Sequence, residues 1–257
     1  MDKVSESAIR FLMLSAIGSI VYCANSKANV TELFSPTMIY GNECEPADLD
    51  SIRVSNEMLL GYVGNDFSRY FLHIDSVIQI NSKEYDIHAR TKHDNEICEL
   101  DAVAKTTKVV SNDYPFKHNY GKNIETFFSL NGRETKCQKS YAIAGELVLY
   151  LFEFADGRII FSSNDGLGSC NDDYSNLQFK GAATLESGET KKIRWGWARI
   201  PESDGLDCGT GEFFPCESIK DSNWIRYTDY YYACTGEKIN TDKCKSILSA
   251  EKWWMLK

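Results

Sequence analysis

The sequence lacks the short motifs that identify most catalytic and cofactor-binding proteins. No Cys-x-x-Cys pair occurs, although zinc sites usually bring their ligands in such close pairs. Ser169 lies in Gly-Leu-Gly-Ser-Cys, and Asn171 stands where a nucleophile elbow needs its second glycine. His88 and His93 are five residues apart, which places them on different faces of a helix or a strand. We therefore predict a non-enzyme without catalytic residues, and we interpret the segment from His88 to His93 as a solvated loop.

Positive charge is also scarce. The chain has 28 lysines and arginines against 37 aspartates and glutamates, which gives a formal net charge of −9. An acidic surface repels phosphate backbones, and no basic stripe interleaved with aromatic residues occurs, so we expect no nucleic-acid partner. A basic protein partner fits this charge better.

Long apolar runs are missing from all but the beginning of the chain. Residues Phe11 to Cys23 carry no charge, but a membrane-spanning helix needs about 20 apolar residues and this run is shorter. It is typical of the apolar part of a signal peptide, and we predict that residues 1–26 form one. A buried N-terminal helix and a lipoprotein with its lipid on Cys23 are the alternatives. We expect no transmembrane segment after signal removal.

Cysteine, in contrast, is abundant. Nine cysteines occur, and one of them, Cys23, lies in the predicted signal peptide. An even number remains, as expected for disulfides formed in an oxidising compartment, either periplasmic or extracellular. Sequence alone does not choose among the 105 pairings that eight cysteines allow, and the simplest set follows chain order. That set is Cys44–Cys98, Cys137–Cys170, Cys208–Cys216 and Cys234–Cys244.

The hydrophobic pattern has mostly period two, which predicts β-strands. In the run from Tyr70 to Ile80, the residues Tyr70, Leu72, Ile74, Ile78 and Ile80 would share one face. Two hairpins are expected, over Tyr141–Ser163 with an Asp156-Gly157 turn and over Leu177–Ile200 with a Ser187-Gly188 turn. Further strands are expected at Leu100–Val110, Ile124–Leu130 and Trp224–Ala233, with a single helix after Asn240 at the C-terminus.

These elements predict a mainly β protein with a disulfide-stapled antiparallel β-sandwich and a C-terminal helix. The polar stretch Ser111 to Asn123 suggests a boundary. It divides the chain into two β-rich subdomains, 27–118 and 119–257, although one continuous domain fits the pattern too.

Two surfaces are candidates for binding. The first is an acidic, glycine-rich loop bounded by Cys208 and Cys216, and a crosslinked loop is ordered before it binds. The second is the aromatic cluster near residue 230, which is either core or an outward platform. The candidate binding residues are Asp204, Asp207, Glu212, Trp224, Tyr230, Tyr231 and Tyr232. A polar loop with Asp165, Asp172 and Asp173 is interpreted as an ordinary turn, with calcium binding as the alternative and no other cofactor expected.

The first hypothesis for function is an exported, non-catalytic protein that recognises another macromolecule. An inhibitor or immunity-type protein that neutralises a toxin or hydrolase would have this composition. The alternatives are a secreted hydrolase that uses the Asp165–Asp173 carboxylates with His88 or His93, and a lectin or adhesin that uses the late aromatic residues.

Overall fold

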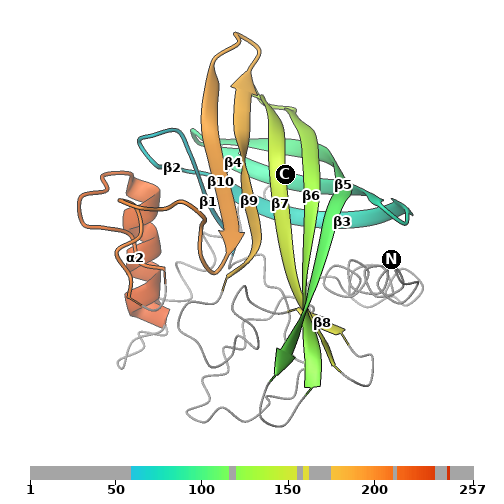
Figure 1. The fold of residues 1–257 in the computed structure, drawn as a ribbon. Helices are drawn as coiled ribbons and strands as arrows, with labels where there is room; N and C mark the ends of the chain where they lie inside the picture. Colours follow the sequence, from blue (N-terminus) through green and yellow to red (C-terminus); the bar gives the residue numbers. More distant parts are fainter. Residues whose placement is uncertain are drawn as a thin grey trace.

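The computed structural model describes residues 59–115, 120–154, 159–161, 175–210, 213–234 and 242–243. They form one antiparallel sheet in which nine strands follow one another in the order β2-β1-β10-β9-β7-β6-β5-β4-β3, with β8 paired to β7 beside this path (Figure 1). The elements are β1 Leu59–Val63, β2 Ser68–Arg69, β3 Phe71–Asn81, β4 Glu84–His93, β5 Glu96–Pro115, β6 Tyr120–Thr135, β7 Tyr141–Phe154, β8 Ile159–Phe161, β9 Asn176–Leu185, β10 Thr190–Trp197 and α2 Ser222–Cys234.

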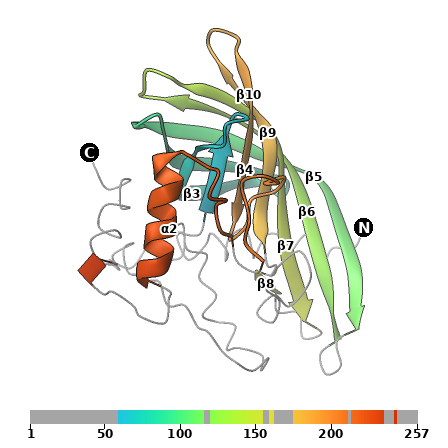
Figure 2. The ribbon, with the colours of Figure 1, turned by 90° about the vertical axis from the view of Figure 1, so that its left-hand side faces the viewer.

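The sheet is curled into a half-barrel, and the predicted sandwich is wrong. A sandwich needs two separate sheets packed face to face, whereas all described strands belong to one sheet that bends around its own apolar face (Figure 2). Bulges help it to bend, because an extra residue kinks a strand and increases its twist. They interrupt the pairing of β3 with β4, of β5 with β6 and of β9 with β10.

The two strands at the ends of the order, β2 and β3, follow each other directly in the chain, and the curl of the sheet makes this connection possible. Only Tyr70 separates β2 from β3. β2 pairs with β1, and the Tyr70 amide donates to the Gly61 carbonyl at 2.9 Å, whereas β3 turns away to pair with β4. The segment from residue 68 to residue 81 is therefore one bent strand that contributes to both ends of the sheet.

The core lies on the inner face of this curl. Alternate residues along each strand point inward, as period two requires. On β6, Ile124, Phe128 and Leu130 are buried, and on β7 the inward residues include Tyr141 and Ile143. Phe179 and Trp195 stack at a centroid distance of 3.7 Å where β9 and β10 cross this face. A second, smaller cluster joins β1 to the segment after β10 and to α2, through Leu60, Tyr62, Ile200, Leu206, Phe213 and Trp224.

α2 corrects the prediction of a strand from Trp224 to Ala233. Asp221 caps the helix: its side chain accepts the Asn223 amide at 2.7 Å, and its carbonyl accepts the amides of Trp224 and Ile225. Trp224 and Tyr227, three residues apart, both pack on the second cluster. Aromatic residues favour strands in general, but here their spacing and the cap decide for a helix.

The face assignment for β3 is also partly wrong. Leu72 is buried, as predicted, but Ile78 and Ile80 are 48% and 53% exposed. A bulge lies between Ile74 and Ser76, and one extra residue moves every following side chain to the opposite face. Val77 therefore takes the inward position that the plain alternation assigns to Ile78.

Both predicted hairpins are confirmed where the structure describes them. β8 pairs with β7, although the Asp156-Gly157 turn lies outside the described residues. β9 pairs with β10 around Gly188, whose φ of +88° explains the glycine at this turn. The strands expected at 100–110 and 124–130 lie within β5 and β6.

Several predictions fall on parts of the chain that are not described. The signal peptide 1–26, the aspartates 165, 172 and 173, Ser169, Glu212 and nearly all of the helix expected after Asn240 are among them. The suggested boundary at 118–119 lies between β5 and β6, which pair from Glu99↔Thr135 to Pro115↔Tyr120, so the sheet contains strands from both predicted subdomains. Within the described residues, no helix has the length and apolarity that crossing a bilayer requires.

Candidate functional site

Two disulfides are present among the described residues, Cys98–Cys137 and Cys208–Cys216. The second confirms the predicted pair. The first overturns two predicted pairs, Cys44–Cys98 and Cys137–Cys170. The reason is the β5–β6 register, in which Glu99 lies opposite Thr135; Cys98 directly precedes the first of these residues and Cys137 follows the second by two positions. The proposed Cys234–Cys244 pair lies outside the described side chains. Both observed disulfides are consistent with an oxidising compartment.

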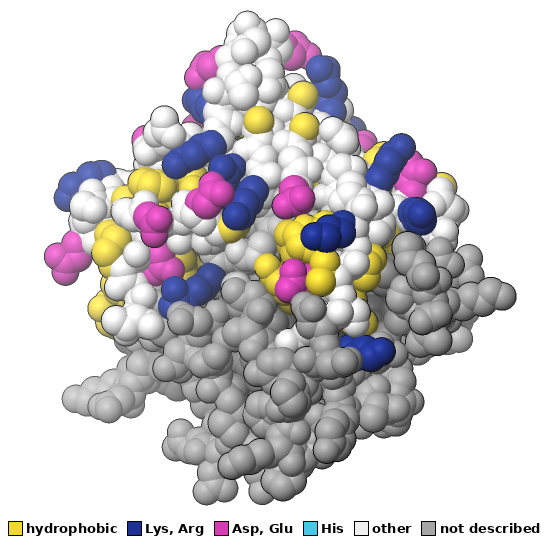
Figure 3. All heavy atoms as spheres, viewed as in Figure 1, with side chains coloured by type: hydrophobic (Ala, Val, Ile, Leu, Met, Phe, Trp, Pro, Cys, Tyr) yellow, Lys and Arg dark blue, Asp and Glu magenta, His cyan; other side chains and the backbone are white. Residues whose placement is uncertain are grey.

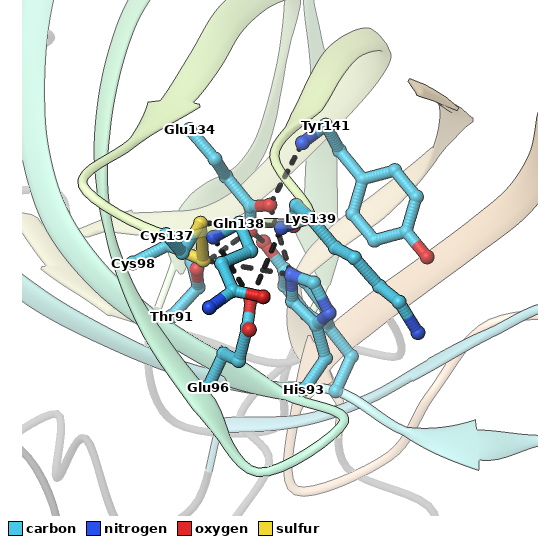
Figure 4. Close-up of a disulfide and its surroundings, with 10 residues drawn as sticks. Thr91, His93, Glu96, Cys98, Glu134, Cys137, Gln138, Lys139 and Tyr141 are labelled. Carbon is cyan, nitrogen blue, oxygen red and sulfur yellow. Dashed lines mark hydrogen bonds and ion pairs between the residues drawn. A yellow bond between two sulfur atoms is a disulfide. The ribbon is translucent and has the colours of Figure 1, made fainter. Parts of the chain in front are cut away.

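The Cys98–Cys137 disulfide lies beside a buried carboxylate, Glu134 on β6 (Figure 4). Oε1 of Glu134 accepts from the Tyr70 hydroxyl and from Thr91 Oγ1, each at 2.6 Å. Oε2 accepts from the Tyr141 amide at 3.0 Å, and His93 Nε2 lies 3.0 Å from the same oxygen. A carboxylate only accepts, so Nε2 carries the proton of this contact. Four donors thus compensate one fully buried charge.

This network sets the ionisation of its members. Burial raises the pKa of Glu134, but the hydrogen bond and charge interaction with His93, together with the Thr91 and Tyr70 hydroxyls, outweigh it and hold the pKa below its ordinary value of 4.5. Burial and the neighbouring Glu134 charge raise the pKa of Tyr70 well above 10. Glu134 is therefore a carboxylate at neutral pH and Tyr70 a neutral donor.

His88 and His93, the two histidines of the hydrolase alternative, do not point toward a common site. His88 and His93 both lie on β4, so the interpretation as a loop is wrong; solvent exposure is confirmed for His88 and wrong for His93, and the predicted opposite faces are confirmed. His88 is exposed, with Nδ1 2.6 Å from Asp101 Oδ1. His93 is buried, and its Nε2 lies 3.6 Å from Cys98 Sγ. A hydrolase that pairs either histidine with the carboxylates near Asp165 stays a prediction.

No sequence motif marks Glu134, Tyr70 and Thr91 as site residues. A signal for Glu134 was nevertheless present. The alternation Ile124, Thr126, Phe128, Leu130 continues to position 134, so the pattern places a carboxylate on the apolar face. A charge at such a position requires partners, and these come from distant strands.

The acidic loop predicted from the sequence is held in place by hydrogen bonds and an ion pair of its own Asp207. The side chain of Asp207 is 8% exposed and lies 3.4 Å from Arg199. Its Oδ1 accepts the amides of Gly209 and Phe214, so it holds the loop that Cys208–Cys216 closes. Asp204, in contrast, is exposed.

One residue of the candidate aromatic surface, Trp224, is not accessible to a partner. Trp224 is fully buried, with its indole nitrogen donating to the Phe67 carbonyl at 2.7 Å, so the core interpretation is confirmed for this residue and the outward alternative is wrong. Tyr232 is exposed, with its ring 5.7 Å from that of Phe214. The side chains of Tyr230 and Tyr231 are outside the described set.

The inner face of the curl holds a small apolar cavity of about 30 Å³. Its lining includes Leu72, Ile87, Leu100, Leu147 and Trp195. This is room for about one water molecule, whereas small-molecule sites measure roughly 300–1,000 Å³. The cavity is therefore a packing feature of the core.

The outer surface offers a different kind of site, the end of β3. β3 is last in the strand order, and residues 76–81 pair on one side only, with β4, among the described residues. This segment reads Ser-Val-Ile-Gln-Ile-Asn and contains no charge, with Ile78 and Ile80 exposed. The face shown in Figure 3 mixes lysine or arginine with acidic side chains. Ion pairs such as Lys136–Glu99 and Lys139–Asp94 occur among the described residues.

The comparisons with known proteins do not add a family to this description. No protein-family model, no curated protein and no solved structure matches the chain.

Proposed function

We propose that this chain is an exported, non-catalytic binding protein that recognises another protein. An extended segment of that partner pairs with the free edge of β3 as an additional strand. The carrying observation is the uncharged edge segment 76–81 with two isoleucines that are half exposed. We call this segment the β3 edge.

An unpaired strand edge presents a row of backbone donors and acceptors, which an extended peptide satisfies as a further strand. Soluble proteins usually protect such edges with charges or proline. The β3 edge has neither, and in this respect it differs from the surrounding surface, where ion pairs such as Lys105–Glu84 are frequent. The exposed isoleucines supply the apolar contacts that give such a strand its side-chain specificity.

Charge favours a basic partner. Beside the β3 edge, on β4, lies Asp86, whereas Glu84 is paired with Lys105, and the whole chain carries −9. A segment that alternates apolar residues with lysine or arginine therefore fits both the isoleucines and the field around them. A basic toxin or hydrolase neutralised outside the cytoplasm is the inhibitor or immunity-type form of this proposal.

Site-specific photocrosslinking tests it with a matched control. Ile80 and Ile225 are both isoleucines, 53% and 54% exposed, on β3 and on α2. A photoreactive residue at position 80 should crosslink to a protein of the exported fraction, and one at position 225 should not. With the purified partner, Ile80→Lys should weaken binding at least about tenfold and Ile225→Lys should not.

Amide hydrogen exchange of the purified complex then locates the contact. Slowed exchange across residues 76–81 supports strand addition. Equal crosslinking at both positions, protection confined to other strands, or a homodimer in sedimentation as the only assembly through this edge would overturn the proposal.

A further inference from the structure

We propose that reduction of the Cys98–Cys137 disulfide turns this corner of the sheet into a zinc site with the ligands His93, Cys98, Glu134 and Cys137. This proposal is independent of the β3 edge. In the described part of the chain, His93, Cys98 and Glu134 each offer one ligand atom, and these atoms lie within 4.8 Å of one another. Cys137 is bonded to Cys98 and supplies the fourth.

The ligands come in two short-spaced pairs on two adjacent hairpin ends. His93 closes β4 and Cys98 lies near the start of β5, joined by a turn at Asp94 and Asn95. Glu134 lies at the end of β6, and Cys137 follows it by three residues, just beyond the strand (Figure 4). Two ligand pairs presented by hairpins are the usual framework of a structural zinc site, although here each pair mixes a thiolate with another ligand type.

One of the observed separations matches a tetrahedral ion, and a second lies close to it. With Zn–S of about 2.3 Å and Zn–N of about 2.05 Å, a tetrahedral angle places sulfur and nitrogen roughly 3.6 Å apart. His93 Nε2 and Cys98 Sγ are separated by 3.6 Å. For nitrogen and carboxylate oxygen the same geometry gives about 3.4 Å, and Nε2 lies 3.0 Å from Glu134 Oε2. Small side-chain shifts bring the nitrogen and oxygen to this spacing, and the two sulfurs must move apart once the Cys98–Cys137 bond is broken.

The chemistry of the donors also selects zinc. Two thiolates are soft ligands and an imidazole is a borderline one, and both types favour zinc over magnesium or calcium. The Tyr70 and Thr91 hydroxyls, which bind Glu134 Oε1, would continue to orient the carboxylate while Oε2 meets the ion. His93 offers Nε2 once its proton moves to Nδ1.

Disulfide and metal exclude each other, because the same two sulfurs are used. A dithiol reductant supplies two electrons and two protons; the Cys98–Cys137 bond breaks, two thiols form, and the dithiol becomes a disulfide. Zinc then binds both sulfurs as thiolates, and the two thiol protons pass to solvent.

Cobalt substitution tests the site in the purified full chain. After reduction with a phosphine, one equivalent of Co²⁺ should give thiolate charge-transfer absorption and the visible bands of tetrahedral cobalt, and Zn²⁺ should displace both. The oxidised chain should give neither. Cys98→Ser should remove the signal, and Cys208→Ser, in the other described disulfide, should retain it.

His93→Asn keeps both thiols and guards against a folding defect. It should form the disulfide normally when oxidised, yet bind Co²⁺ at least about tenfold more weakly when reduced. No cobalt bands in the reduced chain, bands unchanged in Cys98→Ser, or unchanged affinity and spectrum in His93→Asn would each overturn the proposal.

Discussion

Replacing Glu134 by glutamine tests the buried network most directly. The amide keeps the size of the carboxylate, but its NH₂ group turns one acceptor into a donor. Either the Tyr70 and Thr91 hydroxyls or the Tyr141 amide and His93 then face a group that cannot accept. The substitution leaves buried donors unsatisfied.

The expected cost follows from the bonds that are lost. A hydrogen bond to a charged group contributes about 1.5–3 kcal/mol, and two of the four are affected. His93 can recover part of this by changing tautomer, so the free energy of unfolding should fall by about 3–5 kcal/mol. Urea unfolding with the disulfides intact measures it. The control is Glu186→Gln, an exposed carboxylate 3.4 Å from Arg133, which should change stability by less than about 0.5 kcal/mol.

The pH dependence supplies a second, independent readout. The pKa of Glu134 is lowered by folding, so its contribution to stability is present above the unfolded value of 4.5 and is lost as pH falls through the lowered folded value. Glutamine does not titrate, so the difference between wild type and variant should narrow below pH 4.5. A loss under about 1 kcal/mol at neutral pH, with an unchanged m-value, would refute the reasoning.

The remaining predictions concern other parts of the fold. Burial lowers the pKa of His73 from 6.5 to about 4, so the unfolded chain takes up a proton at a higher pH than the folded chain does. The free energy of unfolding should therefore fall by about 3 kcal/mol between pH 7 and pH 4. In urea titrations, His73→Gln should remove this pH dependence. Trp224→Ala should cost about 3–5 kcal/mol, measured by the same titration, because it empties the centre of the second cluster. A disulfide that closes a longer loop restricts the unfolded chain more, and the sequence separations are 39 for Cys98–Cys137 and 8 for the other described disulfide. Replacing both cysteines by serine should therefore cost about 4 kcal/mol at Cys98–Cys137 and about 2.5 kcal/mol at the other disulfide. Equal losses would contradict this argument from loop entropy.

The strands were predictable because each alternation is local. The β9–β10 hairpin follows from its period and from the Ser187-Gly188 turn alone. The curl did not follow, because bulges such as the one between Ile74 and Ser76 depend on the partner strand and leave no mark in the sequence. That single extra residue reversed the assignment of Ile78 and turned the isoleucines of the β3 edge outward.

The sites were predictable only where they are local. Cys208 and Cys216 are close in sequence, and their pairing was found. The pairing of Cys98 with Cys137 depends on the register of β5 with β6, which sequence order does not give. Glu134 carried a signal of its own, but Tyr70 and Thr91 reach it from strands far away in the chain, so their roles become visible only in three dimensions.

The pairing of β1 with β10 has a consequence for how the polypeptide is made. Residue 59 lies opposite residue 197, so the first described strand finds its neighbour only after most of the chain has been synthesised. Until then the backbone donors and acceptors on one side of β1 have no strand to pair with, because their partner is β10. A ribosome-bound chain that stops short of β10 cannot complete the sheet.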